Sequence, residues 1–287
     1  MSGGRLVLVG TPIGNMSDLS PRAASALAGA DVIACEDTRI TRKLLAQAGI
    51  GARRLIALHE HNEAASAARV VALVAGGETV AVVTDAGLPG ISDPGERLVK
   101  AATSAGLEVD VVPGPSAALV ALVVSGLPTD RFCFEGFLPR RGGEKAARLA
   151  AIAAEPRTVV LFESPRRVRS TVGTLASVCG PDRPVAIARE LTKLHEEVWR
   201  GTMGGAVEWL SSVEPRGEYV LVVGGAPATA VVPDGAIEST LSDRLLKGDD
   251  PKKAVAMVAG ALGVPKRRVY EIGLRLRNPD RMGEASR

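Results

Sequence analysis

The chain has 287 residues, of which 46% are hydrophobic and 23% charged, a composition typical of a folded globular protein that excludes global disorder. Its length suits two compact domains with a small appendix. No run of 18 apolar residues occurs and no signal peptide is recognisable, so we expect neither a membrane span nor secretion. The three cysteines are widely spaced without a CxxC pair, so we expect reduced thiols and a cytoplasmic protein.

The formal net charge of +3 is unevenly distributed along the chain. Residues 251–281 hold eight basic side chains against two acidic ones, so the rest of the chain is slightly acidic. A near-neutral body with a basic tail points to a polyanionic partner, although a solvated helical face would carry the same charges.

Between residues 5 and 112, short apolar runs alternate with helical patterns. Ser20 before Pro21 is a typical helix start, and Gly49 and Gly106 stand where helices should end. This alternation predicts a mostly parallel sheet covered by helices on both faces. The expected strands are 6–9, 32–34, 55–58, 80–84 and 109–112, and the expected helices are 21–28, 38–48, 63–75 and 95–105.

After residue 128 the pattern changes, and some neighbouring strands lack long crossovers, so the second sheet should be mixed. Strands are expected at 131–137, 158–162, 184–188, 197–201 and 218–223, with helices at 144–154, 166–179 and 205–212. Helices at 254–262 and 265–276, joined by a Gly263–Val264 turn, suit a helix-turn-helix-like unit. We therefore predict an α/β protein with αβα domains at 1–118 and 119–226, a linker at 227–238 and a basic helical tail at 239–287.

Four loops rich in Gly and Pro, at 10–15, 84–95, 113–117 and 161–165, follow strands at their carboxyl ends, where open α/β sheets bind ligands. Small residues let a backbone approach a ligand closely. Any one loop could be a tight turn, but four together predict a small-molecule cleft between two α/β domains. Neither GxGxxG nor GxxxxGK[ST] occurs, which disfavours the nucleotide-phosphate folds that carry them. His59 and His61 lack further ligands, so we expect no metal site.

Read in order, a set of motifs resembles the small-subunit ribosomal RNA 2′-O-methyltransferase I family, which belongs to the tetrapyrrole-methylase superfamily. The resemblance covers nearly the whole chain. Its motifs are VGTPIGN at 9–15, CEDTR at 35–39, HEHNE at 59–63, TDAGLPGISDPG at 84–95, PGPSA at 113–117, GLPTDRFCFEGFLPR at 126–140, ESPRR at 163–167, ARELTKLHEE at 188–197 and RGEYVLVVGG at 216–225.

The resemblance implies a homodimer that binds S-adenosylmethionine in the cleft between two αβα domains. It implies transfer of a methyl group to the ribose 2′-oxygen of a cytidine in the decoding centre, near the P site, of 16S rRNA in the small ribosomal subunit. The superfamily's cofactor contacts, carried over by position, fall on Pro12, Ile13, Ala86, Gly87, Leu88, Ile91, Ser116, Ala117, Glu163, Leu191 and Glu218.

The proposed reaction needs a group that activates a weakly acidic ribose hydroxyl. We expect Glu36, Arg39 and Lys193 to act in catalysis or to orient the substrate. Asp37 could instead cap the following helix, and Asp85 could contact the cofactor or brace its loop. We interpret Phe132, Phe134 and Phe137 mainly as core or dimer contacts, and His59, His61 and Asn62 as loop scaffolding or an RNA contact.

The basic tail completes the hypothesis, because Lys252, Lys253, Lys266, Arg267 and Arg268 could neutralise RNA phosphates. Two alternatives remain. One is a tetrapyrrole C-methyltransferase of the same fold, against which the first loop, GTPIGN, departs from the GxGPGD usual in that branch. The other is a non-catalytic RNA-binding assembly factor, which has no evident need for a cofactor cleft.

Overall fold

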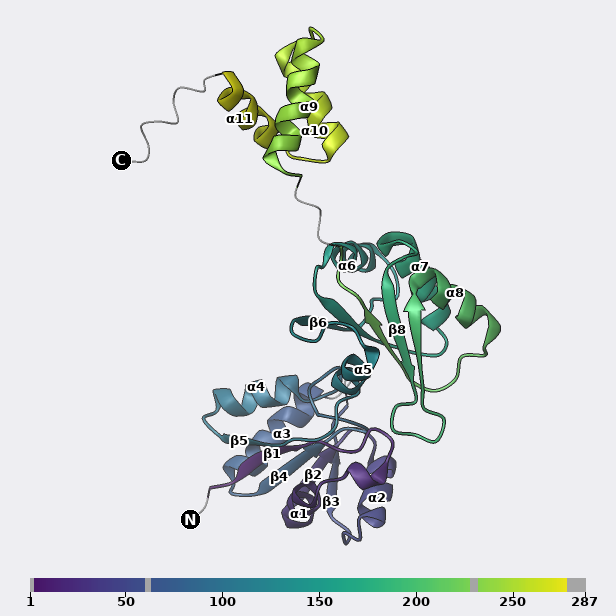
Figure 1. The fold of residues 1–287 in the computed structure, drawn as a ribbon. Helices are drawn as coiled ribbons and strands as arrows, with labels where there is room; N and C mark the ends of the chain where they lie inside the picture. The colour runs from purple at the N-terminus through teal and green to yellow at the C-terminus, as the bar shows by residue number, and fades with distance from the viewer. Residues whose placement is uncertain (1–2, 60–62, 228–231, 278–287) are drawn as a thin grey trace. The chain divides into compact units, whose positions relative to one another are not determined.

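The structure is a computed structural model that describes residues 3–59, 63–227 and 232–277. The chain divides into two compact units, residues 1–226 and 227–287 (Figure 1). The first unit contains two five-stranded sheets, and the described part of the second unit is helical. Within the described ranges, no helix is long and apolar enough to cross a membrane.

The first sheet is parallel throughout, as predicted, with the strand order β3-β2-β4-β1-β5. Helices α1 and α2 pack on one face through Ala23, Leu27 and Leu45, and α3 and α4 cover the other through Val70 and Leu98 (Figure 1). The strands are β1 (Arg5–Val9), β2 (Val32–Cys35), β3 (Arg54–Ala57), β4 (Thr79–Val83) and β5 (Glu108–Val112). The helices are the short 3₁₀ turn η1 (Met16–Asp18), α1 (Pro21–Gly29), α2 (Thr38–Gln47), α3 (Glu63–Ala75) and α4 (Glu96–Ser104).

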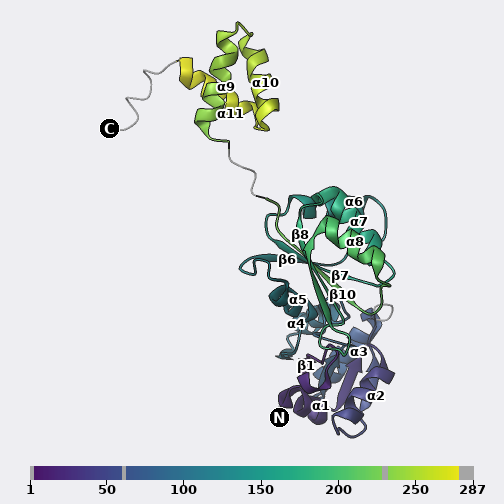
Figure 2. The ribbon, with the colours of Figure 1, turned by 45° about the vertical axis from the view of Figure 1, so that its right-hand side comes forward.

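The second sheet is mixed, as predicted, with the strand order β6-β7-β10-β8-β9. Strand β6 runs parallel to β7, and the other neighbours are antiparallel. Helices α6, α7 and α8 cover one face and α5 packs on the other (Figure 2). The strands are β6 (Phe132–Phe137), β7 (Thr158–Glu163), β8 (Pro184–Arg189), β9 (Glu197–Thr202) and β10 (Tyr219–Val223). The helices are α5 (Ala117–Ser125), α6 (Gly143–Ala154), α7 (Val168–Cys179) and α8 (Met203–Ser212).

The predicted domain boundary between residues 118 and 119 falls inside helix α5, which belongs with the second sheet. Ala118, Ala121 and Leu122 of α5 pack against Val160 and Val220 of that sheet. The helix is apolar almost all round; one face packs on this sheet, and Leu119 and Val123 on the other are 50% and 72% exposed.

The second unit contains α9 (Asp234–Leu246), α10 (Pro251–Leu262) and α11 (Lys266–Arg277). The left-handed Gly263, with φ +63°, ends α10 at the predicted turn. The predicted linker at 227–238 is wrong in its second half, because α9 begins at Asp234. Ile237 and Leu241 form an apolar stripe on α9 that packs with Ala254, Val258, Val269 and Ile272 of the other two helices.

Candidate functional site

The loops that follow several strands of the first unit meet around one cavity of about 400 Å³. Ten of the eleven predicted cofactor residues line it. Pro12 is buried in the first loop but is not among the lining residues. The lining residues are Ile13, Glu36, Asp85, Ala86, Gly87, Leu88, Ile91, Ser92, Asp93, Ser116, Ala117, Phe137, Phe162, Glu163, Ser164, Pro165, Leu191, Glu218, Tyr219 and Val220.

The first three loops are held together by backbone contacts that require small residues. Thr11 and Gly87 exchange backbone hydrogen bonds of 2.8 and 3.2 Å, which joins the loops after β1 and β4. A Cβ atom on Gly10 would lie 2.6 Å from the nitrogen of Gly114, and a Cβ on Gly114 would lie 2.8 Å from Gly10. The loops after β1 and β5 therefore touch through glycine backbones, and their amides and carbonyls are left as contact groups.

Carboxylates from three segments border the cavity: Glu36 after β2, Asp85 and Asp93 in the loop between β4 and α4, and Glu218 before β10. Asp85 Oδ1 accepts a hydrogen bond from the Asp37 amide at 3.1 Å, so Asp85 braces its loop and also lines the cavity. Burial, reinforced by the charge of Asp85, raises the pKa of Glu36. Burial likewise raises the pKa of Asp85.

Asp93 is a functional candidate that the sequence reasoning missed. Burial, together with the negative charges of Glu36, Asp85 and Glu218, raises the pKa of Asp93 to about 7. Asp85 lies in the same loop as Asp93, but Glu36 and Glu218 come from distant segments, so composition and spacing carry no sign of the shift. A carboxyl group that titrates near neutrality beside a cavity is the kind of group that catalysis uses for proton transfer.

Asp37 and Arg39 form a pair outside the cavity lining. Asp37 is the N-cap of α2 and accepts a hydrogen bond from the Arg39 amide at 2.7 Å, so its alternative role as a cap is confirmed. Its carboxylate also binds the Arg39 guanidinium, and this contact lowers the pKa of Asp37 to about 2. The Arg39 side chain is 85% exposed. Arg39 therefore lies at the surface, outside the cavity lining, and its expected part in orienting the substrate stays a prediction.

Lys193 is not among the residues that line the cavity, and its side chain is bound to two carboxylates. Its Nζ donates to Glu190 at 2.8 Å and to Glu218 at 2.9 Å. Burial disfavours the ammonium, but these hydrogen bonds outweigh it and raise the pKa of Lys193. The lysine therefore stays protonated near neutrality, and it orients the cavity residue Glu218 rather than serving as a base.

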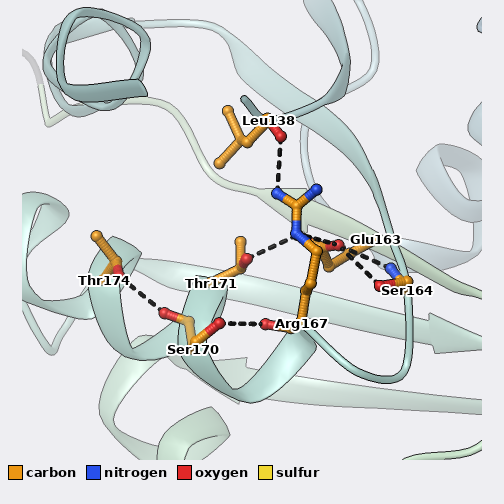
Figure 3. A network of polar contacts seen from close by, with 7 residues as sticks. All are labelled: Leu138, Glu163, Ser164, Arg167, Ser170, Thr171 and Thr174. Atoms are coloured by element: carbon orange, nitrogen blue, oxygen red, sulfur yellow. Dashed lines mark hydrogen bonds and ion pairs between the residues drawn. The ribbon is translucent and has the colours of Figure 1, made fainter. Parts of the chain in front are cut away.

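Glu163 lines the cavity, but its carboxylate is occupied by the turn between β7 and α7 (Figure 3). Its side chain is 1% exposed. One oxygen accepts from the Ser164 amide at 2.8 Å and lies 3.4 Å from Arg167 Nε, and the other accepts from the Thr171 hydroxyl at 2.6 Å. Arg167 in turn donates to the Leu138 carbonyl at 2.7 Å. This network fixes the turn that presents Ser164 and Pro165 to the cavity.

Phe137 was expected in the core or in a dimer contact, but it is 51% exposed and lines the cavity. A β-bulge shifts the register of β6 between Phe134 and Gly136, where φ is +58°. The bulge brings Phe137 beside Phe162, at a ring distance of 5.7 Å, and Phe134 contacts the same ring at 5.0 Å. Strict strand alternation would have placed Phe134 and Phe137 on opposite faces.

The basic side chains of the second unit differ in how they are held. Arg268 donates to Asp234 at 2.7 Å and to the Val232 carbonyl at 2.8 Å, so its guanidinium is bound within the unit, and its role as an RNA contact stays a prediction. Arg267 is paired with Glu271 at 2.8 Å. Across residues 232–277, the three predicted lysine contacts form no ion pair; they are Lys252, Lys253 and Lys266.

In the described part of the chain, no group of three His, Cys, Asp or Glu side chains is arranged to hold a metal ion. The cysteines Cys35, Cys133 and Cys179 are not joined by disulfides. Three residues of the HEHNE motif, Glu60, His61 and Asn62, lie outside the described residues.

Comparisons with known proteins find similar chains over most of the sequence. Residues 5–207 match the family model of the Tetrapyrrole (Corrin/Porphyrin) Methylases. Among solved structures, a uroporphyrin-III-C-methyltransferase from Thermus thermophilus is similar, with a TM-score of 0.56 and 26% identity over 77% of this chain and 94% of that one. A diphthine synthase shares the fold, with a TM-score of 0.62 and 16% identity over 77% of this chain and 90% of that one.

Proteins named Ribosomal RNA small subunit methyltransferase I match over nearly the full length. The protein of Mycobacterium tuberculosis (strain CDC 1551 / Oshkosh) is 45% identical over 96% of this chain and 97% of its own. That of Escherichia coli O157:H7 is 44% identical over 95% and 96%. That of Mesorhizobium japonicum is 43% identical over 97% and 94%. The chain therefore belongs to the ribosomal RNA small subunit methyltransferase I family, within the tetrapyrrole methylases.

Proposed function

We propose that this protein transfers a methyl group from S-adenosylmethionine to the ribose 2′-oxygen of a cytidine in the decoding centre of 16S rRNA, within the small ribosomal subunit. The proposal rests on family membership at 43–45% identity over nearly the whole chain. The observation that carries it is the cavity, where glycine-rich loops, carboxylates and two phenylalanine rings converge.

The residues around the cavity fit a cationic, partly aromatic cofactor. S-adenosylmethionine carries positive charge on its sulfonium and amino groups, and Glu36, Asp85, Asp93 and Glu218 supply the opposite charge. Its flat adenine suits the small residues of the loops and the exposed ring of Phe137. When bound, S-adenosylmethionine supplies an electrophilic methyl group already activated for transfer.

The residues of this chain would align the ribose and remove its proton. A carboxylate that borders the cavity would accept the proton of the ribose 2′-hydroxyl. Asp93 is the candidate acceptor, because a pKa of about 7 suits proton transfer near neutral pH. Glu36, the acceptor expected from the sequence, also borders the cavity and contributes to raising the pKa of Asp93.

The second unit would contact the RNA through Lys252, Lys253, Lys266 and Arg267, which are exposed. We further propose a cytoplasmic homodimer. The homodimer and the cytoplasmic location rest on the resemblance, and the RNA contacts rest on the charge of the tail. Sedimentation of the full chain tests the homodimer, and its affinity for RNA tests the contacts.

The decisive experiment is transfer of labelled methyl groups to small subunits isolated from cells that lack this protein, beside naked rRNA and a tetrapyrrole precursor. We expect label on the subunit, at one cytidine whose ribose resists alkaline cleavage. Label on the tetrapyrrole instead would show a small-molecule C-methyltransferase. The absence of cofactor binding would show an RNA-binding assembly factor.

A further inference from the structure

The second unit contains a groove of about 510 Å³ that the proposed chemistry of the first unit does not use. All three helices contribute to it. Its lining residues are Leu241 and Leu245 of α9, Asp250, Pro251, Lys252 and Val255 at the start of α10, and Tyr270, Gly273 and Leu274 of α11.

Two features of α11 shape this groove. A Cβ atom on Gly273 would lie 3.1 Å from Leu241 Cδ2, so α11 sits close to α9 there and leaves the floor without a side chain. Tyr270 and Leu274, one helical turn apart, are 56% and 47% exposed. An aromatic ring and an aliphatic side chain are thus exposed together, next to the part of the groove that Gly273 leaves unfilled.

The charge around the groove selects the kind of ligand. Helix α11 carries five basic side chains against one acidic one, Glu271. Lys252 lines the groove itself, and Lys266 precedes Tyr270 by four residues, so it lies on the same face of α11. The one carboxylate in the lining, Asp250, accepts hydrogen bonds from the amides of Lys252 and Lys253 as the cap of α10.

We propose that this groove binds an unstacked nucleobase of single-stranded RNA, stacked on Tyr270, with the adjoining phosphates near Lys252 and Lys266. The inference rests on the proposed RNA substrate and adds a base-binding subsite to it. A flat apolar group flanked by anionic charge is what an exposed aromatic ring between lysines fits. An acidic peptide would meet the same lysines but would leave the ring without a stacking partner.

The test measures the affinity of the full-length chain for a short unstructured oligoribonucleotide and for an RNA duplex, by fluorescence anisotropy. Tyr270→Ala should weaken binding of the single strand about tenfold and leave duplex binding unchanged, because only an unpaired base can stack. Tyr270→Phe, which keeps the ring, should bind like the wild type. Leu246→Ala, which removes an 86% exposed leucine of α9 outside the groove lining, is the matched control.

Several results would overturn the inference. They are no binding of the single strand by the wild type, equal affinities of wild type and Tyr270→Ala, or equal losses for single strand and duplex. Loss of binding to intact subunits with unchanged oligonucleotide binding would assign the groove to a protein segment, and a changed sedimentation rate would assign it to a second copy. Methyl transfer to the subunit, measured in parallel, tests the proposed function separately, because wild-type protein that binds the oligonucleotide but transfers no label contradicts only that function.

Discussion

The cavity of the first unit and the groove of the second are built in opposite ways. The cavity collects loops spread from Ile13 to Val220, and its charged lining residues are acidic. The groove is made by three consecutive helices, and free lysines stand beside its ring and aliphatic side chains. This contrast suits a protein that holds a small cation in one unit and a polyanion in the other. It also indicates which residues of each unit should affect binding or stability when they are replaced.

The largest effect on stability and cofactor binding is expected at Gly114, where two cavity loops touch through glycine backbones. Gly114→Ala places a Cβ 2.8 Å from the backbone of Gly10, which cannot yield as a flexible side chain would. We expect the free energy of unfolding to fall by about 1–3 kcal/mol and cofactor binding to be lost. Urea denaturation and isothermal titration calorimetry measure the two effects.

Gly173→Ala is the matched control for this substitution. It lies within helix α7, and nothing stands within 4 Å of the added Cβ. Because alanine favours a helix more than glycine does, it should raise the free energy of unfolding by about 0.5–1 kcal/mol. If Gly114→Ala were as stable as this control, the close approach of the two loops would be refuted.

A similar loss of stability, but a smaller loss of cofactor binding, is expected from the buried network behind the cavity. Glu163→Gln keeps the shape of the side chain but removes the charge that binds Arg167, and its amide cannot accept at both former oxygen positions. Stability should fall by about 1–3 kcal/mol, with a parallel weakening of cofactor binding as the Ser164 turn loosens.

The surface pair of Glu214 and Arg216 provides a control with similar chemistry, because Glu214→Gln also breaks a contact to an arginine. We expect no measurable change in stability from this exposed pair. A Glu163→Gln variant with wild-type stability and only weaker cofactor binding would show that Glu163 contacts the cofactor directly and does not hold the turn.

The sequence located the cavity well because its glycine and proline loops are visible as composition. It did not reveal Asp93, since the raised pKa of this residue depends on its burial and on carboxylates that include Glu36 and Glu218 from distant segments. Phe137 was misplaced because a bulge changes the alternation of β6. In the tail, charge alone could not show that Arg268 binds Asp234, 34 residues earlier in the chain.

The pH dependence of stability tests the environment of Asp93. Its folded pKa of about 7 lies above the value of about 3.9 in an unfolded chain. Between these values the folded state binds more protons, so the contribution of Asp93 to the free energy of unfolding falls as pH rises from about 4 to about 7. Asp93→Asn should therefore be more stable than the wild type at and above neutral pH, and the difference should close toward pH 4 in thermal unfolding curves.

The same group should link cofactor binding to protons. A bound cation favours the ionised carboxylate, so wild-type affinity should rise with pH through about 7 and binding should release protons. Calorimetry in buffers of different ionisation enthalpy measures this release. A wild-type profile as flat as that of Asp93→Asn would place the titrating group elsewhere.

The smallest effects are expected in the salt dependence of RNA binding, where the unpaired lysines of the second unit should differ from the bound Arg268. Replacing Lys252, Lys253 and Lys266 with Gln should make the slope of log affinity against log salt shallower by about 2 for single-stranded RNA, because each phosphate contact contributes about 0.7. Arg268→Gln removes one positive charge, as each lysine replacement does, but also breaks the contacts to Asp234 and the Val232 carbonyl, so it should lower the thermal stability of the second unit and leave the slope unchanged. If Arg268→Gln instead changed the slope as much as Lys266→Gln, the contact between Arg268 and Asp234 would have to break when RNA binds. The helical unit would then change its conformation on binding.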